Sequence, residues 1–192
     1  MLLHFRKQSA DFAGNRYRVR VESTTVNVHA FEIDVDKQGG YFQVVYQGMS
    51  QQPPSADGLV VISDPTGRIG DVVLILEIKD TLDHGARASR QILTTIEHFC
   101  RCSTHAHLPY DGQRLHQEAL SQPELRLDAR HHVVGLYVGG PAQYPRRVRI
   151  QQMSQDVCGK SIYLWMHESR RPVIEVSAEA LLDELKERFG IS

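Results

Sequence analysis

Three ionisable residues, Asp57, Glu77 and Lys79, have the types and the spacing to form a catalytic group. If the chain turns back on itself around Gly67, the register of the resulting hairpin places Asp57 opposite Glu77. Directly opposed side chains in antiparallel strands have Cβ atoms roughly 4.5–5.5 Å apart. Because side chains alternate along a strand, Lys79 projects from the same face as Glu77. The spacing therefore predicts two carboxylates and an amine at one end of a hairpin.

The two carboxylates would repel each other unless a cation neutralised them. Proteins hold hard divalent ions such as Mg²⁺ with one or two carboxylates, together with waters and substrate phosphate. A lysine beside such an ion can orient or deprotonate an attacking water, or stabilise negative charge on a phosphate. These residue types are the ones that hydrolysis of a phosphodiester requires.

The hairpin that must position these groups is built from two apolar runs, Leu59 to Ile62 and Val72 to Leu76. The segment between them contains Asp64-Pro65-Thr66-Gly67-Arg68, a composition typical of a turn between two strands. Both runs are nearly continuous in aliphatic residues, so both of their faces should be covered. We expect the hairpin to lie centrally in a sheet that is flanked by helices.

An amphipathic helix is predicted directly after the hairpin, from about Ala86 to Cys100. Gln91 lies in its second turn, and Arg87 and Arg90 are candidates for phosphate contacts. The apolar positions of this segment recur at helical spacing and should pack on the sheet. They are Ala88, Ile92, Leu93, Ile96 and Phe99.

The order of Asp57, a hairpin, Glu77-Ile78-Lys79 and a following helix resembles the PD-(D/E)xK nuclease superfamily. This is the fold of restriction endonucleases, Holliday-junction resolvases and many phage and toxin nucleases. The resemblance covers Ser55 to about Cys102, and Ala56 stands where the family usually has proline. It implies an α/β fold with a central mixed β-sheet flanked by helices and a restriction endonuclease-like core. We expect a single nuclease-like domain over residues 1–192, with its core at about 23–140 and C-terminal strands and a helix at 145–190.

The resemblance also implies a set of roles for the residues at the end of the hairpin. Asp57, Glu77 and the main-chain carbonyl of Ile78 would bind Mg²⁺ or Mn²⁺. Lys79 would position the attacking water. Gln91 would be auxiliary, because many members place a glutamine on this helix, where an amide both donates and accepts hydrogen bonds.

Members of the family often carry a further acid on an N-terminal helix, and Glu32 is the candidate here. Ser23-Thr24-Thr25 could cap a helix through Val26 to Glu32, ended by Gly39-Gly40, with a strand following at Tyr41 to Tyr46. The β-branched residues also allow Val26 to Glu32 to be a strand. Glu32 would otherwise be an ordinary surface glutamate, and Glu22 is a weaker substitute.

Composition limits how the chain could hold nucleic acid. The chain has 192 residues, 41% hydrophobic and 23% charged, which are globular values. A net charge of −1 argues against a broad basic surface, so phosphate contacts must be local, at Arg87, Arg90, Arg146 and Arg147. No apolar run approaches the roughly 20 residues of a membrane span, and no signal peptide is evident. We expect a cytoplasmic protein that binds DNA in preference to RNA, as a possible homodimer or part of a larger assembly.

The three cysteines, Cys100, Cys102 and Cys158, are expected to be reduced thiols. Cys100 and Cys102 followed by His105 and His107 invite a zinc site, because thiolate and imidazole suit that ion. The spacing of these four residues is unlike that of the usual zinc knuckles. The alternative is a helix end that runs into a polar loop.

The remaining chain predicts further strands around the hairpin. A short helix is expected over Arg114 to Leu120, within a polar tract. The apolar run His131 to Gly140 should lie parallel to the Glu77 strand after the helical crossover. Two strands, Ser161 to Met166 and Pro172 to Val176, should precede a closing helix that Ser177 caps.

These observations predict a Mg²⁺-dependent DNA endonuclease acting in restriction, repair, phage biology or interbacterial toxicity. The resemblance implies in-line attack on phosphorus that leaves a 5′-phosphate. Two alternatives stay open: a non-catalytic interaction module that kept the fold, and an RNase with the same site.

Overall fold

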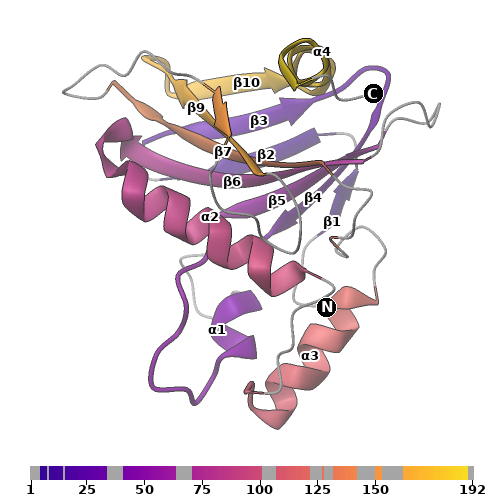
Figure 1. The fold of residues 1–192 in the computed structure, drawn as a ribbon, viewed down its shortest axis with the longest axis vertical. Helices are drawn as coiled ribbons and strands as arrows, with labels where there is room; N and C mark the ends of the chain where they lie inside the picture. The colour runs from indigo at the N-terminus through magenta and orange to yellow at the C-terminus, as the bar shows by residue number, and fades with distance from the viewer. Residues whose placement is uncertain are drawn as a thin grey trace.

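The computed structural model has an α/β fold, as the sequence predicts. It describes residues 5–7, 9–14, 16–33, 41–63, 71–100, 107–121, 127, 132–141, 150–152 and 162–189. Within these residues the chain forms a seven-stranded sheet, a three-stranded sheet and four α-helices. The large sheet lies between a layer of helices on one face and the small sheet with the last helix on the other (Figure 1).

The large sheet is mixed and holds the predicted hairpin at its centre. Its strands follow the order β1-β4-β5-β6-β7-β9-β8. The strands are β1 (Phe5–Lys7), β4 (Asn27–Glu32), β5 (Gly58–Ser63), β6 (Val72–Thr81), β7 (His132–Gly140), β8 (Ile150–Gln152) and β9 (Ile162–Glu168). Parallel pairing joins β6 to β7 and β7 to β9, and the other neighbours are antiparallel. The C-terminal strands therefore extend the same sheet as the hairpin.

The register of the hairpin is the predicted one. Gly58 pairs with Leu76 and Ile62 with Val72, so the next pair outward is Asp57 with Glu77. The parallel arrangement of β7 is also confirmed, with Val72 beside His132 and Glu77 beside Tyr137. His132 consequently lies at the end of the sheet opposite from Glu77.

Three α-helices cover one face of the large sheet: α1 (Tyr41–Val45), α2 (Gly85–Phe99) and α3 (Tyr110–Leu120). A single turn of 3₁₀-helix, η1 (Leu82–His84), joins β6 to α2. Figure 1 shows α2 running across this face, with α1 and α3 beyond it. Ile75 of β6 packs here with Ile92 and Phe99 of α2 in one buried cluster. The predicted helix after the hairpin is confirmed, and its apolar stripe faces the sheet.

The opposite face is covered by the small sheet and by α4 (Ala178–Phe189). The small sheet has the order β10-β3-β2, from β10 (Val173–Ser177), β3 (Arg18–Glu22) and β2 (Ser9–Ala13). Leu76 of β6 packs here with Phe12 of β2 and Leu185 of α4. Both faces of the hairpin are therefore buried, and each fully buried Leu or Ile adds about 1.5–3 kcal/mol to the stability of the fold.

The predicted helix over Val26 to Glu32 is wrong, because this segment is strand β4 between β1 and β5. Val28 and Ala30 pack on the small-sheet side, whereas Phe31 packs on the helical side, which is the alternation of a strand. The predicted cap, Ser23-Thr24-Thr25, instead binds the carboxylate of Glu179 on α4. Glu179 Oε1 accepts hydrogen bonds from the Thr24 nitrogen at 2.7 Å, the Ser23 hydroxyl at 2.8 Å and the Thr25 nitrogen at 2.9 Å.

The predicted strand over Tyr41 to Tyr46 is also wrong, because Tyr41–Val45 forms the short helix α1. Tyr41, Phe42 and Val45 are buried, a spacing that one face of a helix provides and a strand does not. Phe42 lies against His98 of α2, with ring centroids 4.6 Å apart. These contacts with α2 outweigh the β-propensity of the aromatic and β-branched residues.

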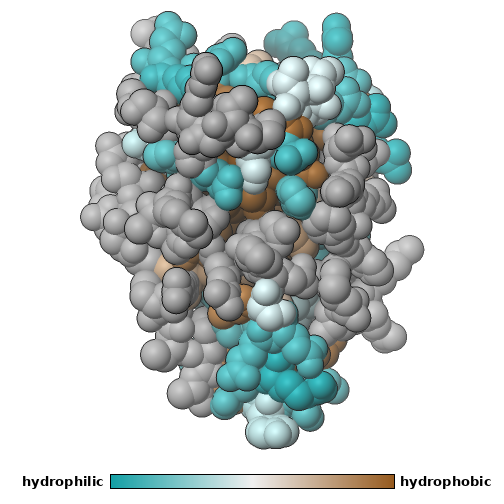
Figure 2. All heavy atoms as spheres, turned by 90° about the vertical axis from the view of Figure 1, so that its right-hand side faces the viewer, coloured by the Kyte–Doolittle hydropathy of each residue, from teal (hydrophilic) through white to brown (hydrophobic). Residues whose placement is uncertain are grey.

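The surface reflects this layered packing. Figure 2 shows one face on which hydrophobic atoms are visible in the upper half beside hydrophilic residues, while the lower end is hydrophilic. Among the helices described, none has both the length and the apolar character needed to cross a membrane.

Candidate active site

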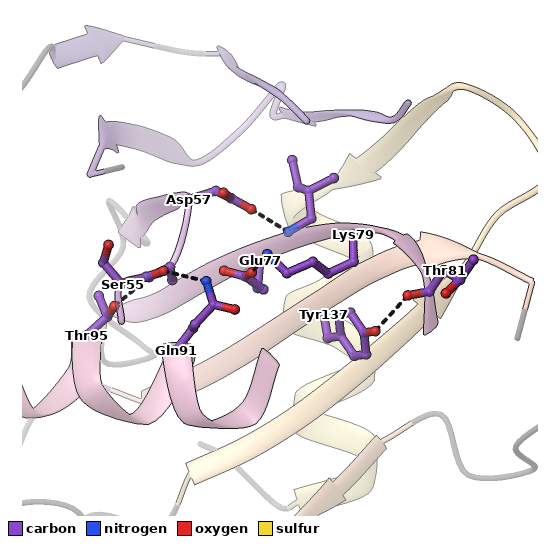
Figure 3. Close-up of polar contacts among 10 residues, drawn as sticks. Ser55, Asp57, Glu77, Lys79, Thr81, Gln91, Thr95 and Tyr137 are labelled. Carbon is purple, nitrogen blue, oxygen red and sulfur yellow. Dashed lines mark hydrogen bonds and ion pairs between the residues drawn. The ribbon is translucent and has the colours of Figure 1, made fainter. Parts of the chain in front are cut away.

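Asp57 is fixed at the mouth of the hairpin by hydrogen bonds to two neighbouring strands. Its Oδ2 accepts a hydrogen bond of 2.6 Å from the main-chain nitrogen of Ile78 on β6. Its main-chain carbonyl accepts one of 3.1 Å from the nitrogen of Ile33, just beyond β4. Figure 3 shows the carboxylate directed at the β6 main chain beside Glu77. The predicted convergence of Asp57 with the Glu77-Ile78-Lys79 segment is present in the structure.

The two residues before Asp57 are held by helix α2. The Gln91 amide nitrogen donates to the Ser55 carbonyl at 2.8 Å, and the Ala56 nitrogen donates to Thr95 Oγ1 at 2.8 Å (Figure 3). Ser55, Ala56 and Thr95 are all buried. A proline at position 56 has no N–H and could not bind Thr95. Alanine at this position therefore has a structural use.

Glu77 is a fully buried carboxylate on the face of β6 that meets α2. Its side chain has 0% exposure, and it shares a face with Ile75 of the helical-side cluster. The Lys79 ammonium forms an ion pair with Glu77 Oε1 and retains 21% side-chain exposure. Burying a carboxylate without a partner is costly, so Lys79 stabilises the charged form of Glu77 in this position. The strand alternation predicted for these two residues is confirmed.

Gln91 projects from α2 toward Glu77, where an acceptor atom is buried. The side chain is 7% exposed, and among the described residues its Oε1 has no hydrogen-bond partner. Figure 3 shows this amide lying between Ser55 and Glu77. A buried acceptor that makes no hydrogen bond costs about 1–3 kcal/mol. A water or a ligand with a donor group would remove that cost, so the position is suited to hold one.

Tyr137 borders the site and was not anticipated from the sequence. It pairs with Glu77 across β6 and β7 and belongs to the same helical-side cluster as Ile75. Its hydroxyl donates to the Thr81 carbonyl at 2.8 Å, which ties β7 to the end of β6. The only sequence signal was its place in the apolar run 131–140, whose register with β6 is set by the fold. Ser55 and Thr95 were also missed, because their contacts depend on how α2 packs against the hairpin.

Glu32 lies near the site in the sheet but on the other face. It ends strand β4, half-buried, and pairs with Gly58. Alternation from Ala30 directs it to the small-sheet side, where Phe12 packs so closely on Gly58 that a β-carbon there would overlap the ring. The structure therefore does not bring Glu32 to the face that carries Glu77, and the N-terminal helix expected to present it is absent from residues 16–33.

The candidate phosphate-binding arginines fall into two groups. Arg87 and Arg90 are exposed on α2, and Arg87 lies one helical turn before Gln91. Arg90 lines a cavity on the neighbouring side of the helix. Arg146 and Arg147 lie outside the described residues.

The donor atoms at the hairpin mouth suit a hard cation. Asp57 and Glu77 supply carboxylates, and Gln91 supplies the buried amide oxygen, all of the oxygen type that Mg²⁺ and Mn²⁺ prefer. The Lys79 ammonium already places one positive charge beside the Glu77 carboxylate. In the part of the chain that is described, no group of three or more His, Cys, Asp or Glu side chains is arranged to hold a metal. A site here would thus rely on two carboxylates and on neutral oxygens.

The cysteine prediction needs a correction. Cys100 is disulfide-bonded and buried directly after α2, so the expectation of reduced thiols is wrong at this position. A cysteine in a disulfide has no thiolate to offer, which removes Cys100 from the alternative zinc site. Cys102, His105 and Cys158 lie outside the described residues.

Comparison with known proteins gave no match: neither a family model, nor a curated protein, nor a solved structure is similar to this chain. The geometry of the site and general chemistry are therefore the grounds on which a function can be proposed.

Proposed function

We propose that the chain is a metal-dependent phosphodiesterase, and specifically a DNA endonuclease with a restriction endonuclease-like core. The observation that carries the proposal is the convergence of Asp57, Glu77 and Lys79 at the open end of one buried hairpin. A fully buried carboxylate with a half-buried carboxylate and ammonium beside it is rarely kept without a use, because the desolvation of charged groups is costly.

In this proposal Asp57, Glu77 and the Ile78 carbonyl hold Mg²⁺ or Mn²⁺. When bound, the ion would polarise the phosphate and make a water more acidic. Lys79, which is partly exposed beside buried Glu77, holds the attacking water or a phosphate oxygen. The Gln91 Oε1 accepts a hydrogen bond from a water at the site. Arg87 supplies a positive charge one helical turn from Gln91, where a phosphate of the substrate backbone would lie.

A DNA substrate is proposed in preference to RNA, on the resemblance to nucleases that act on DNA. The near-zero net charge limits phosphate contacts to the neighbourhood of the site. The chain would therefore gain affinity from a second copy or from a larger assembly. A cytoplasmic location belongs to this proposal as the sequence predicts it. The Cys100 disulfide is the one described feature that favours an oxidising compartment instead.

One observation favours the non-catalytic alternative. Glu77 and Lys79 form a closed ion pair, and Glu77 has no solvent exposure, as in a pair that serves stability alone. The two functions differ in what substitution does. A structural pair affects folding, whereas a catalytic pair also affects turnover in variants that remain folded.

A plasmid-nicking assay with Mg²⁺ or Mn²⁺ tests the proposal directly. The wild type should convert supercoiled to open-circular DNA, and EDTA should stop the reaction. Asp57→Asn, Glu77→Gln and Lys79→Met should each lower the rate by at least about 100-fold, the scale on which positioned acid-base groups act. The same assay with a structured RNA distinguishes a DNase from an RNase.

Arg114→Ala is the matched control, because Arg114 forms an exposed ion pair with Glu118 on α3 and has no part in the site. It should cleave like the wild type. Absence of cleavage by the wild type, or full cleavage by the three site variants, would contradict the proposal.

A further inference from the structure

A cavity of about 440 Å³ lies beside the candidate active site, between the end of α1, the segment 49–54 and α2. This volume falls in the range of small-molecule sites, about 300–1,000 Å³. Its lining residues are Tyr46, Met49, Gln51, Gln52, Pro53, Pro54, Arg90, Thr94, Glu97, His98 and His107. The proposed nuclease chemistry does not use this cavity.

The two chain segments that line the cavity, residues 51–54 and helix α2, also lead to residues of the candidate active site. Pro53 and Pro54 line it, and the chain then continues within three residues to Asp57. Three residues span at most about 10–11 Å, comparable with the length of one or two nucleotides. Arg90 on the helical wall directly precedes Gln91, which faces the site. A strand of nucleic acid with a phosphate at Asp57 would thus have a neighbouring nucleotide at the cavity.

The inner wall of the cavity is aromatic and held rigidly. Tyr46 and His98 are buried, and the Tyr46 hydroxyl lies 2.9 Å from His98 Nδ1. The second ring nitrogen, His98 Nε2, lies 3.0 Å from the Tyr41 hydroxyl, which lies 2.9 Å from His116 Nδ1. Burial raises the pKa of Tyr46 to about 12, so its hydroxyl stays neutral and keeps this bond at neutral pH.

The ring of His107 stands exposed at the cavity, with its centroid 6.4 Å from that of Tyr46. An imidazole in this position offers an aromatic face at the mouth. Stacking of a nucleobase on an aromatic side chain is worth about 1–3 kcal/mol.

Two charged residues of α2, Arg90 and Glu97, line the cavity. Arg90 and Glu97 are seven residues apart on the helix, which is about 10 Å along its axis. Thr94 lies between them, and Gln51 and Gln52 add amide groups from the opposite wall. The cavity therefore offers a cation for a phosphate, aromatic surface for a planar ring, and acceptors for the edge of that ring.

We propose that this cavity binds one unpaired nucleotide whose base carries an exocyclic amine. The phosphate would lie at Arg90, and the amine would donate to the Glu97 carboxylate, as glutamate accepts from cytosine N4 in nucleic-acid complexes. The inference rests on the proposed function, because it assigns the cavity to the same substrate. It adds that the substrate must be single-stranded, or have a base turned out of the stack, next to the cleaved phosphate.

The test is the anisotropy of a fluorescently labelled oligo-dC strand, titrated with the full chain in EDTA so that no cleavage occurs. The wild type should bind oligo-dC more tightly than oligo-dT, which lacks the amine, and more tightly than a blunt duplex. Arg90→Ala removes the cation, and Thr94→Trp fills the cavity. Each should weaken oligo-dC binding by about tenfold, the effect of losing one stacking or phosphate contact. Glu97→Gln should reduce the preference for oligo-dC over oligo-dT.

Arg170→Ala is the control, since Arg170 is an exposed arginine outside the cavity. It should bind like the wild type, and thermal melting should show that every variant is folded. Equal binding by wild type and Thr94→Trp, equal binding of duplex and single strand, or no binding of any strand would overturn the proposal.

The binding and cleavage results separate the two proposals. Cavity-dependent binding without metal-dependent nicking would support the cavity and contradict the nuclease. Nicking that Thr94→Trp leaves unchanged, together with unchanged binding, would support the nuclease and overturn the cavity.

Discussion

The carboxylate of Asp57 accepts a 2.6 Å hydrogen bond from the main-chain nitrogen of Ile78, within one residue of Glu77. In a regular antiparallel ladder, a carbonyl oxygen of the neighbouring strand would accept from such a nitrogen. Here a side chain takes that place, at the residue directly before β5 begins. Asp57 thus both terminates the ladder and presents a carboxylate beside the buried acid of β6.

This double role predicts different outcomes for two substitutions at Asp57. Asp57→Ala removes the acceptor of the Ile78 nitrogen and should lower the free energy of unfolding by about 1–3 kcal/mol, the cost of a half-buried donor without a partner. Asp57→Asn keeps an oxygen acceptor and should stay within about 1 kcal/mol of the wild type while losing the negative charge. Urea denaturation measures the first effect, and isothermal titration with Mn²⁺ measures the second. Equal stability of the two variants would contradict the role of this bond.

The ion pair between Glu77 and Lys79 gives a second prediction. Lys79→Met removes the positive charge from a fully buried carboxylate and should destabilise the fold by about 3–5 kcal/mol at neutral pH. Glu77→Gln combined with Lys79→Met should recover much of this loss, because no buried charge is then left uncompensated. A double-mutant cycle by chemical denaturation measures the coupling. Strict additivity of the two changes would show that the pair is not coupled in solution.

The hydrogen bond from the Ala56 nitrogen to Thr95 Oγ1 predicts an effect at a distance from the site. Thr95→Val keeps the shape of the side chain but removes the hydroxyl. The free energy of unfolding should therefore fall by about 1–3 kcal/mol. Thr95→Ser retains the hydroxyl and serves as the control. Because this bond positions the residue before Asp57, Thr95→Val should also slow any metal-dependent nicking more than Thr95→Ser does. Identical behaviour of the two variants would argue against an anchoring role for α2.

Glu179 predicts how stability depends on pH. Partial burial alone would raise its pKa, but hydrogen bonds from Thr25, Ser23 and Thr24 outweigh burial and hold it far below the ordinary value of 4.5. A carboxyl whose pKa is lowered in the folded state stabilises that state above pH 4.5, and the contribution is lost as the pH falls further. Glu179→Gln should therefore lower stability at pH 7 by about 1–2 kcal/mol, and the difference from wild type should shrink toward pH 2. Thermal melts of both proteins between pH 2 and pH 7 check this, and a difference that does not change with pH would contradict it.

The sequence was informative where local rules decide the structure. One turn centre sets the register of an antiparallel hairpin, so the alignment of Asp57 with Glu77 followed from residue numbers and matches the observed pairing of Gly58 with Leu76. The helix after the hairpin, the parallel strand β7 and the closing helix were likewise predicted, since periodicity and caps mark them. The Ser177 hydroxyl indeed accepts a hydrogen bond from the Ala180 nitrogen at the start of α4.

The sequence failed where distant contacts decide between helix and strand. Asn27–Glu32 became a strand because β1 and β5 lie on either side of it, and Tyr41–Val45 became a helix because its rings pack on α2. Neither partner is visible in the local pattern. The same holds for Tyr137 and Thr95, whose roles depend on the packing of β7 and α2 against the hairpin.

An anomalous-difference map from a crystal soaked in Mn²⁺ tests the proposed metal site most directly. We expect a peak between the carboxylates of Asp57 and Glu77, with the Lys79 ammonium displaced from Glu77. The same soak of a Glu77→Gln crystal should show no such peak. An empty position between Asp57 and Glu77 in the wild type, with the Glu77 to Lys79 pair intact at saturating Mn²⁺, would contradict the metal-dependent nuclease.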